Sequence, residues 1–296
     1  MMSTTVKSVI FLAITFAVTW GIVIGGWSAG WHNDPQRAFY VLTLSMFGPA
    51  IAALICSTAF EKGRRLGALG LRFKPNWWWL LAWLFPVLIA SGSVALTIAL
   101  SPHGLVDPGS AAIALAEARS PQAAEQARAI PFLGVIVLVQ ALLLGALVNG
   151  VILTISEELG WRGYLYDLWR GAGFWRSSLA TGAFWGIWHA PMIYLFGHNY
   201  PDHRLLGVGL FTVFCMILSP MMTLVRDRGQ SVWAAGVFHG TFNALGGLTV
   251  LMVGNAAFPW NGAVGIGGFI ALAIGFAVVV VLQRGGTPPD AVPAQA

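Results

Sequence analysis

Two adjacent carboxylates, Glu157 and Glu158, follow directly on an apolar run that is long enough to cross a bilayer. A charged side chain is costly there, by ~2.5–3.5 kcal/mol at the centre of a membrane helix and less near its end. Folding a hydrophobic bundle does not require such charges, so the pair indicates a function. Two later apolar runs carry polar partners, His189 in one and His239 with Asn243 in the other. We expect these side chains to meet in one cavity between helices, because buried polar groups in a membrane must satisfy one another.

A glutamate and a histidine in an apolar cavity can activate water. Surrounded by apolar groups, Glu157 becomes a usable base near neutrality, and beside His189 it can take a proton from water and direct the hydroxide at a carbonyl. His239 and Asn243 can then donate hydrogen bonds to the developing oxyanion, each worth ~2.7–4 kcal/mol in other hydrolases. The set predicts peptide hydrolysis without a covalent intermediate.

A zinc site is the competing interpretation of the same residues. Glu157, His189 and His239 could supply three ligands and leave a fourth position for water. The sequence lacks the His-Glu-x-x-His helix of common zinc peptidases, although residues from three helices can hold a metal without it. We expect that no cofactor is required, and zinc remains the alternative.

Helical spacing predicts which residues support this site. Glu158 and Arg162 lie four apart and can pair on one helix face. Trp185 lies one turn before His189 and would form a wall beside it. Pro191 removes a backbone donor two residues after His189, which loosens that helix.

Other polar residues have simpler interpretations. A lone Asn such as Asn243 can also serve as a contact between membrane helices, worth ~0.6 kcal/mol on average. His198 and His203 fall in a short loop with Asp202, where we expect them to be solvated and without a role.

The composition gives the setting of these residues. The 296-residue chain is 57% hydrophobic and 9% charged, with a mean hydropathy of +0.75. Soluble domains carry about 25% charged residues, so the chain is predicted to be an all-α, polytopic membrane protein. Its pI near 9.6 follows from Lys and Arg in cytoplasmic loops and does not indicate nucleic acid. Its partners are expected to be the lipid bilayer and a peptide substrate.

Eight apolar segments, each near the ~20 residues that span a bilayer, predict about eight transmembrane helices enclosing an intramembrane cavity. They cover approximately residues 6–28, 37–60, 77–100, 131–155, 177–197, 204–225, 231–253 and 261–283. Between the third and fourth segments we expect a short amphipathic helix around 110–128, outside the bilayer. We expect one membrane domain over 1–284, with its core at about 131–253, and a disordered tail over 285–296.

The distribution of basic residues predicts the orientation. With the amino terminus inside, the inner segments contain twelve basic residues: Lys7, Lys62, Arg64, Arg65, Arg72, Lys74, Arg162, Arg170, Arg176, Arg226, Arg228 and Arg284. The outer segments contain four: Arg37, Arg119, Arg128 and Arg204. This bias predicts a multi-pass protein of the cell (inner) membrane with both termini in the cytoplasm.

The same motifs resemble the CPBP family of intramembrane endopeptidases, which includes type II CAAX prenyl proteases and bacteriocin-processing or immunity proteins. The family pattern is Glu-Glu-x-x-x-Arg, then Phe-x-x-x-His, then His-x-x-x-Asn. Residues 157–162 match the first motif and residues 239–243 the third. In the second motif Trp185 stands where Phe is usual, while His189 is in place.

The resemblance implies an eight-helix bundle whose cavity opens towards the cytoplasmic leaflet. It implies that Glu157 and His189 activate water, that His239 and Asn243 stabilise the oxyanion, and that a peptide is cut, in the best-known members near a prenylated C-terminus. Two other functions stay open: a non-catalytic binding or immunity protein of the same fold, and a proton-coupled transporter, for which buried Glu and His are also typical.

One geometric difficulty is visible in the sequence. At 1.5 Å per residue, His189 lies ~18 Å along its apolar run and His239 ~12 Å along its own. Glu157 lies at the very end of its run. The three meet only if the fourth helix is displaced or tilted outward, or if the fifth begins well below the bilayer.

Overall fold

The computed structural model describes residues 2–254 and 256–284, and within them the secondary structure is entirely helical. The α-helical elements are α1 (Thr4–Ser28), α2 (Pro35–Ser45), α3 (Gly48–Phe60), α4 (Arg65–Ala68), α5 (Trp77–Leu100), α6 (Pro108–Glu117), α7 (Pro121–Arg128), α8 (Leu133–Val139), α9 (Ala146–Leu153), α10 (Tyr166–Trp169), α11 (Phe174–Trp188), α12 (Ala190–Phe196), α13 (Arg204–Arg228), α14 (Val232–Met252) and α15 (Ile266–Arg284). Two π-helices, η2 (Gln140–Gly145) and η3 (Thr154–Leu165), and three short 3₁₀ turns, η1 (Trp31–Asn33), η4 (Arg170–Ala172) and η5 (Gly262–Val264), complete the path.

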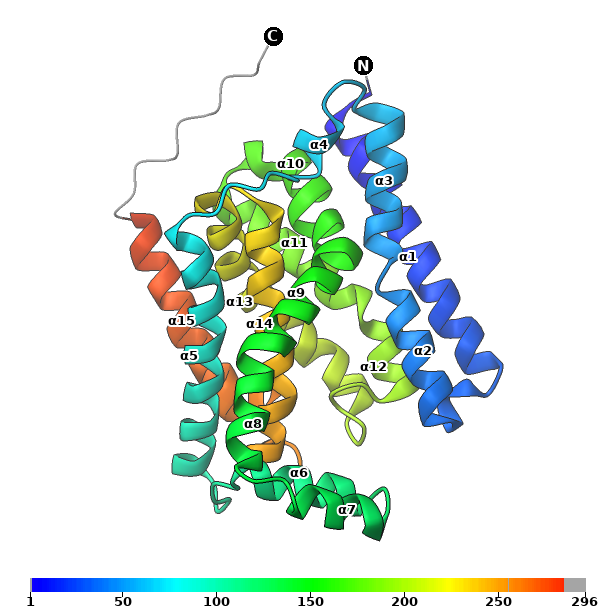
Figure 1. The fold of residues 1–296 in the computed structure, drawn as a ribbon. Coiled ribbons are helices and arrows are strands. Elements are labelled where there is room, and N and C mark those ends of the chain that lie inside the picture. The colour runs from blue at the N-terminus through cyan, green and yellow to red at the C-terminus, as the bar shows by residue number, and fades with distance from the viewer. Residues whose placement is uncertain (1, 255, 285–296) are drawn as a thin grey trace.

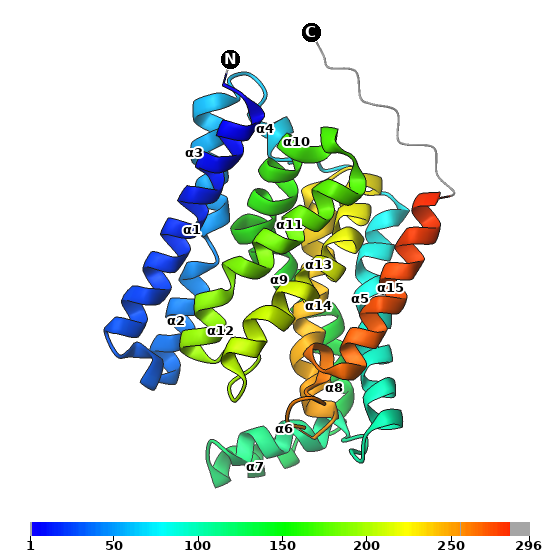
Figure 2. The same ribbon diagram turned by 180° about the vertical axis from the view of Figure 1, so that it is seen from behind.

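The helices form a bundle whose centre is built by α9, α11, α13 and α14 (Figure 1). The pair α5 and α15 covers one side of this centre, and α1, α2 and α3 cover the opposite side. Seen from behind, α11 and α13 run together across the middle of the molecule (Figure 2). The site helices are therefore enclosed between two outer groups.

Helix starts coincide with capping residues. Asp34 accepts hydrogen bonds from the backbone of Gln36 and Arg37 and is followed by a proline, which favours a first turn. Asn76 and Ser231 cap α5 and α14 in the same way. These local signals fix where the long helices begin.

The described chain contains six helical segments that are long and apolar enough to cross a membrane. They are Thr4–Ser28, Pro35–Phe60, Trp77–Leu100, Leu133–Ala172, Arg204–Arg228 and Ile266–Arg284. This confirms an all-α, multi-pass membrane protein. The other two expected spans correspond to the broken pair α11–α12 and to α14, which carries His239, Asn243 and several glycines. The count of eight stays a prediction.

The fourth expected span ends too early in the sequence-based prediction. The apolar run stops at residue 155, but the helical path continues through η3 and α10 to Ala172. Glu157 therefore lies well inside a 40-residue helical segment and not at its end. The sequence alone places Glu157 at the end of its apolar run, too far along to meet His189 and His239. Because the helical segment continues beyond Glu157, no outward shift of the helix is needed for the three to meet.

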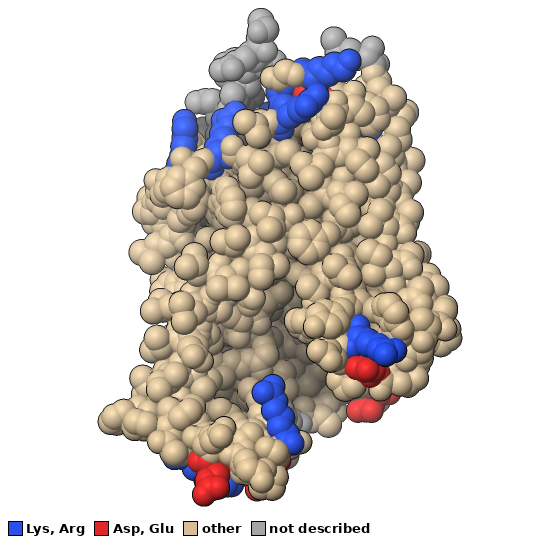
Figure 3. Space-filling model, turned by 45° about the vertical axis from the view of Figure 1, so that its right-hand side comes forward, with Lys and Arg blue, Asp and Glu red and all other residues tan. Residues whose placement is uncertain are grey.

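Charges gather at the two ends of the bundle. Lys and Arg cluster at the end where α1 begins and α4 lies, and a broad uncharged band separates them from the other end (Figure 3). At the basic end Lys7 pairs with Glu61 at 2.6 Å, and Arg64 bridges Glu61 and Asp167 at 3.1 and 2.8 Å. These pairs connect α1 and the loop after α3 with α10.

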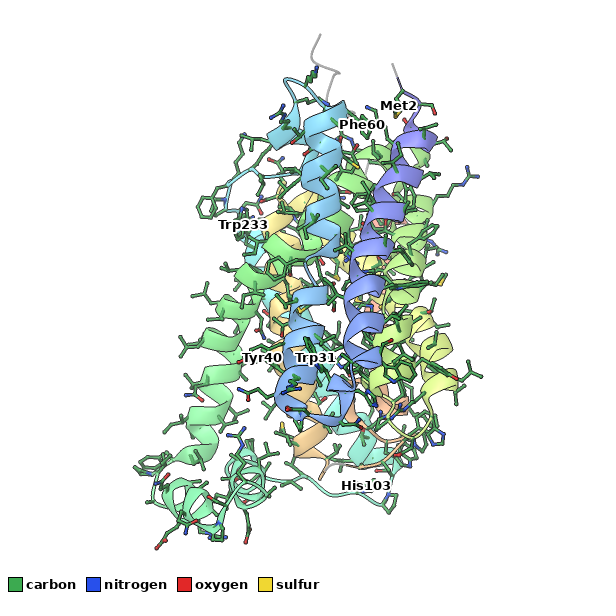
Figure 4. The ribbon with its side chains drawn as sticks, turned by 90° about the vertical axis from the view of Figure 1, so that its right-hand side faces the viewer. Met2, Trp31, Tyr40, Phe60, His103 and Trp233 are labelled. Carbon is green, nitrogen blue, oxygen red and sulfur yellow. The ribbon has the colours of Figure 1, made fainter. Side chains whose placement is uncertain are left out.

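The opposite end carries α6 and α7 (Figure 1). Met2 and Phe60 lie at the basic end, Trp31 and Tyr40 lie further down, and His103 lies at the far end (Figure 4). Two short helices, separated near Pro121, replace the single amphipathic helix expected around 110–128. The expected tail over 285–296 lies outside the described residues.

Candidate active site

Three helical segments far apart in the sequence line one cavity of about 390 Å³. It is lined by Glu157 of η3, by Trp185 and His189 of the α11–α12 region, and by His239 and Asn243 of α14. All four residues expected to act on substrate face this space, together with the expected wall residue Trp185. The volume is in the range of ordinary ligand pockets.

Small residues allow the site helices to approach closely. A Cβ atom on Gly240 of α14 would collide with the backbone of Gly150 on α9. Gly160, in the motif segment, meets Pro49 of α3 in the same way. Backbone contact of this kind is typical of membrane helix packing, and it sets His239 close to η3.

The motif segment is a π-helix. Every residue of η3 except Ile155 is buried. Short π-helical insertions often occur at functional sites because the wider turn redirects side chains. Here the two adjacent carboxylates contact different partners.

Glu157 is held by an aromatic donor. The Trp185 indole N–H donates to Glu157 Oε2 at 2.9 Å, and Glu157 is a buried residue that lines the cavity. The backbone carbonyl of Trp185 receives the Nδ1–H of His189 at 2.8 Å, because a carbonyl can only accept. In the neutral ring, His189 Nε2 is then an acceptor.

The helix that bears His189 is interrupted at that residue. α11 ends at Trp188, α12 begins at Ala190, and Pro191 occupies the first turn of α12. The expected loosening by Pro191 is confirmed. Phe211 stacks edge-on against the His189 ring with centroids 4.8 Å apart, so the imidazole is held by packing as well as by its hydrogen bond.

Glu158 points away from Glu157 and joins two other site residues. Its carboxylate accepts from Arg162 Nη1 at 3.0 Å, which is the expected one-turn pair. The same Oε1 lies 2.9 Å from His239 Nδ1, a contact that spacing within one helix could not reveal. An ionised carboxylate only accepts, so His239 Nδ1 carries the proton. Its Nε2 donates only when the ring is doubly protonated.

Arg162 and Asn243 complete the arrangement. Arg162 is fully buried, with its guanidinium carbon 4.4 Å from the centre of the Trp185 ring. Its backbone carbonyl receives a hydrogen bond from Arg226 Nε at 3.0 Å. Asn243 lies one turn after His239 and lines the cavity with its side chain accessible from it.

The loop after α12 adds residues that the sequence did not single out. His198 and Asn199 line the same cavity, and the His198 side chain is exposed, as the sequence suggested. The loop folds inward because Tyr200 donates to the Val264 carbonyl at 2.8 Å and Asn261 donates to the Asn199 carbonyl at 3.3 Å. No spacing signal in the sequence indicates this fold of the loop.

The alternative zinc set is not arranged as a metal site. Within residues 2–254 and 256–284, no three His, Cys, Asp or Glu side chains come together as a metal requires. The Nδ1 atoms of His189 and His239 contact Trp185 and Glu158, so a metal ligand in either ring would be Nε2. Glu157, His189 and His239 share a cavity without being gathered into one such group.

The cavity extends away from the basic end. Besides the site residues it is lined by Val250 near the end of α14, by Asn199 and by Val264. Figure 3 shows a hollow in the uncharged surface, in the half away from the Lys- and Arg-rich end. The cavity lining therefore reaches towards the end of the bundle that carries α6 and α7.

Comparison with known proteins shows what the segment that carries the three motifs is similar to. Residues 139–245 match the model of the family described as type II CAAX prenyl endopeptidase Rce1-like. A protein named CAAX prenyl protease 2, from Methanococcus maripaludis, is 45% identical over 94 residues, which cover 29% of this chain and 34% of that protein. The chain thus matches about a third of the length of this curated relative.

Proposed function

We propose that the protein is an intramembrane endopeptidase, because residues 139–245 match the Rce1-like type II CAAX prenyl endopeptidase family model. One observation carries the proposal: Glu157, His189, His239 and Asn243 line the same cavity, although they come from separate helical segments. No folding requirement explains these four polar side chains around a space whose other walls are mostly apolar.

In the proposed reaction, water is the nucleophile. Glu157 takes one proton from a water molecule whose other hydrogen bonds to the acceptor Nε2 of His189. The hydroxide oxygen attacks the peptide carbonyl carbon, and the carbonyl electron pair moves onto oxygen. When that pair returns, the C–N bond breaks and the Glu157 carboxyl group gives its proton to the leaving amine. No covalent enzyme intermediate and no cofactor are required.

The developing oxyanion needs donors on the other side of the substrate. Asn243 offers its amide N–H groups, and His239 offers Nε2–H when its ring is doubly protonated. Glu158 balances the charge of that imidazolium, since its carboxylate contacts His239 Nδ1 at 2.9 Å. Arg162 in turn fixes Glu158, so the supporting pair acts through His239 and does not contact substrate.

The walls of the cavity suggest the class of substrate. Phe211, Phe214, Leu218 and Phe242 line it on the α13 and α14 side, and Leu42 and Met46 line it on the α2 side. Such walls suit an extended apolar peptide segment, including one near a lipidated C-terminus. We propose a membrane-associated peptide, prenylated or otherwise apolar, as the substrate.

The decisive experiment measures peptide cleavage by purified protein in lipid vesicles. Glu157→Gln keeps the shape and the Trp185 hydrogen bond but cannot take a proton, so cleavage of fluorogenic farnesylated and unmodified C-terminal peptides should nearly disappear. Glu125→Gln, at an exposed position of α7, is the matched control and should retain full activity. Cleavage by Glu157→Gln at the wild-type rate would refute the proposed base, and cleavage of neither peptide by the wild-type protein would refute this substrate class.

A further inference from the structure

Buried polar atoms without hydrogen-bond partners lie behind the candidate site, where α11 packs on α13. Arg162 pairs with Glu158 through Nη1, but neither its Nε nor its Nη2 has a partner among the described residues. The hydroxyl groups of Thr181, Ser219 and Thr223 are also buried and likewise without partners there. We refer to Arg162, Thr181, Ser219 and Thr223 as the polar seam.

The packing of the helices places the first members of the seam together. The guanidinium of Arg162 stacks on Trp185 at 4.4 Å, and Thr181 lies one turn before Trp185 on the same face of α11. The next residue, Gly182, packs against Ser219 so closely that a Cβ atom on Gly182 would collide with the Ser219 side chain. Thr181 therefore lies next to Gly182, which abuts Ser219, and one turn of α11 away from Trp185, on which Arg162 stacks.

Thr223 extends the seam towards the basic end. It lies four residues after Ser219 and therefore on the same face of α13. Three residues further along, Arg226 donates to the backbone carbonyl of Arg162 at 3.0 Å. This contact holds the face of α13 that bears Thr223 against η3.

Such a group of atoms is costly in a dry interior. A guanidinium has five N–H donors, and the donors on Nε and Nη2 have no acceptor within residues 2–254 and 256–284. Buried polar atoms that lack protein partners are commonly satisfied by ordered water, which needs two to four polar contacts. The hydroxyl groups of the seam provide such contacts, because each can both donate and accept.

We propose that the polar seam is a binding site for a cluster of buried water molecules that bridges Arg162 to α11 and α13. The cluster lies on the other side of Arg162 from its contact with Glu158. It satisfies the outward-facing donors of the guanidinium and so keeps Nη1 directed at Glu158. The seam is a positioning site: it acts on His239 through Glu158 and does not contact substrate.

The first test uses the sign of a stability change. Thr181→Val and Thr223→Val remove the hydroxyl group at almost constant shape. If the seam is hydrated, each variant leaves a bound water molecule without one of its hydrogen-bond partners. The apparent Tm in detergent should then fall by about 2–4 °C. If the seam is dry, each variant removes an unsatisfied buried group, and the Tm should stay or rise, which would overturn the proposal. Thr212→Val on α13 is the control, because its hydroxyl donates within its own helix at 2.8 Å and its loss should change the Tm little.

The second test does not depend on variant stability. X-ray irradiation of the wild-type protein generates hydroxyl radicals from bound water in place. Cys215 is fully buried, four residues before Ser219 on the same face of α13, and its thiol is a sensitive reporter of such radicals. Oxidation of Cys215 in the folded wild-type protein supports the cluster. Full protection of Cys215 under irradiation that oxidises exposed side chains would overturn it.

The third test rests on the proposed function. Loss of the cluster should lower kcat about two- to tenfold and leave KM unchanged, because positioning is lost and binding is not. The Tm and radiolysis results stand even if no peptide is cleaved, so failure of the endopeptidase proposal and failure of the water cluster are distinguishable.

Discussion

The indole N–H of Trp185 donates to the carboxylate of Glu157 at 2.9 Å, while the backbone carbonyl of the same tryptophan accepts from His189. One residue therefore orients both groups that are proposed to activate water. Phe, the usual residue of the second motif in the family that the chain resembles, offers an aromatic wall but no N–H. Trp in place of Phe at position 185 therefore adds a hydrogen bond to the Glu157 carboxylate.

Trp185→Phe tests the role of this hydrogen bond. The variant keeps the aromatic wall but leaves Glu157 without its donor, and a hydrogen bond to a charged group is worth ~1.5–3 kcal/mol. We expect kcat to fall about tenfold or more, with little change in KM or in expression. Steady-state cleavage kinetics measure both parameters, and an unchanged kcat would show that this hydrogen bond does not orient the base.

Glu157 and Glu158 should behave differently when each is changed to Gln. Glu157→Gln keeps its hydrogen bond and should unfold at a Tm close to that of the wild type, while activity is lost. Glu158→Gln weakens a buried ion pair with Arg162, whose full loss would cost ~3–5 kcal/mol, so both Tm and activity should fall. Thermal unfolding of the two variants side by side is the measurement. Equal Tm values would contradict the separate roles.

Arg162→Lys keeps the positive charge but loses the planar guanidinium and its stacking on Trp185. Activity should fall while the protein still inserts and purifies normally. The comparison variant is Arg128→Lys on exposed α7, which should be fully active. Wild-type activity in Arg162→Lys would show that the guanidinium is not needed to position Glu158.

Asn243→Ala should leave slow but measurable turnover, because losing one oxyanion donor typically costs about 10²–10³ in rate. The same preparation allows a test for metal. Active protein should contain no stoichiometric zinc, and it should survive chelation. One tightly held zinc per chain, with activity lost on removal and restored on return, would replace the glutamate mechanism by the zinc alternative.

The helices and the motif residues could be predicted from the sequence, because apolar runs and one-turn spacings are local signals. The Glu158–Arg162 pair is of this kind. The contact of Glu158 with His239 depends on packing between η3 and α14, 81 residues apart in the chain, and spacing within one helix does not report it. The continuation of the fourth helix was missed for a related reason: residues after Ile155 are too polar for lipid, but they are buried by protein.

The orientation in the membrane is a further prediction. The basic end should face the cytoplasm, so Lys62→Cys should react with a membrane-impermeant reagent only in inside-out vesicles, and Glu125→Cys only in intact cells. Both positions are exposed, and the native Cys56 and Cys215 are fully buried and should stay unlabelled. With this result the cavity would face away from the cytoplasm. The opposite labelling would reverse the topology and place the cavity on the cytoplasmic side.

The order of the site residues in the sequence has a consequence for biosynthesis. A ribosome releases η3 first, α11 later and α14 last of the three, so the carboxylates enter the membrane before the histidine and the asparagine of α14 exist. During that interval Glu158 has Arg162 as its partner, one turn away and already synthesised, so this pair can insert without net charge. The cavity acquires its full set of polar groups only when the penultimate helix is in place. The proposed hydrolytic site is therefore incomplete until insertion of the chain is almost finished.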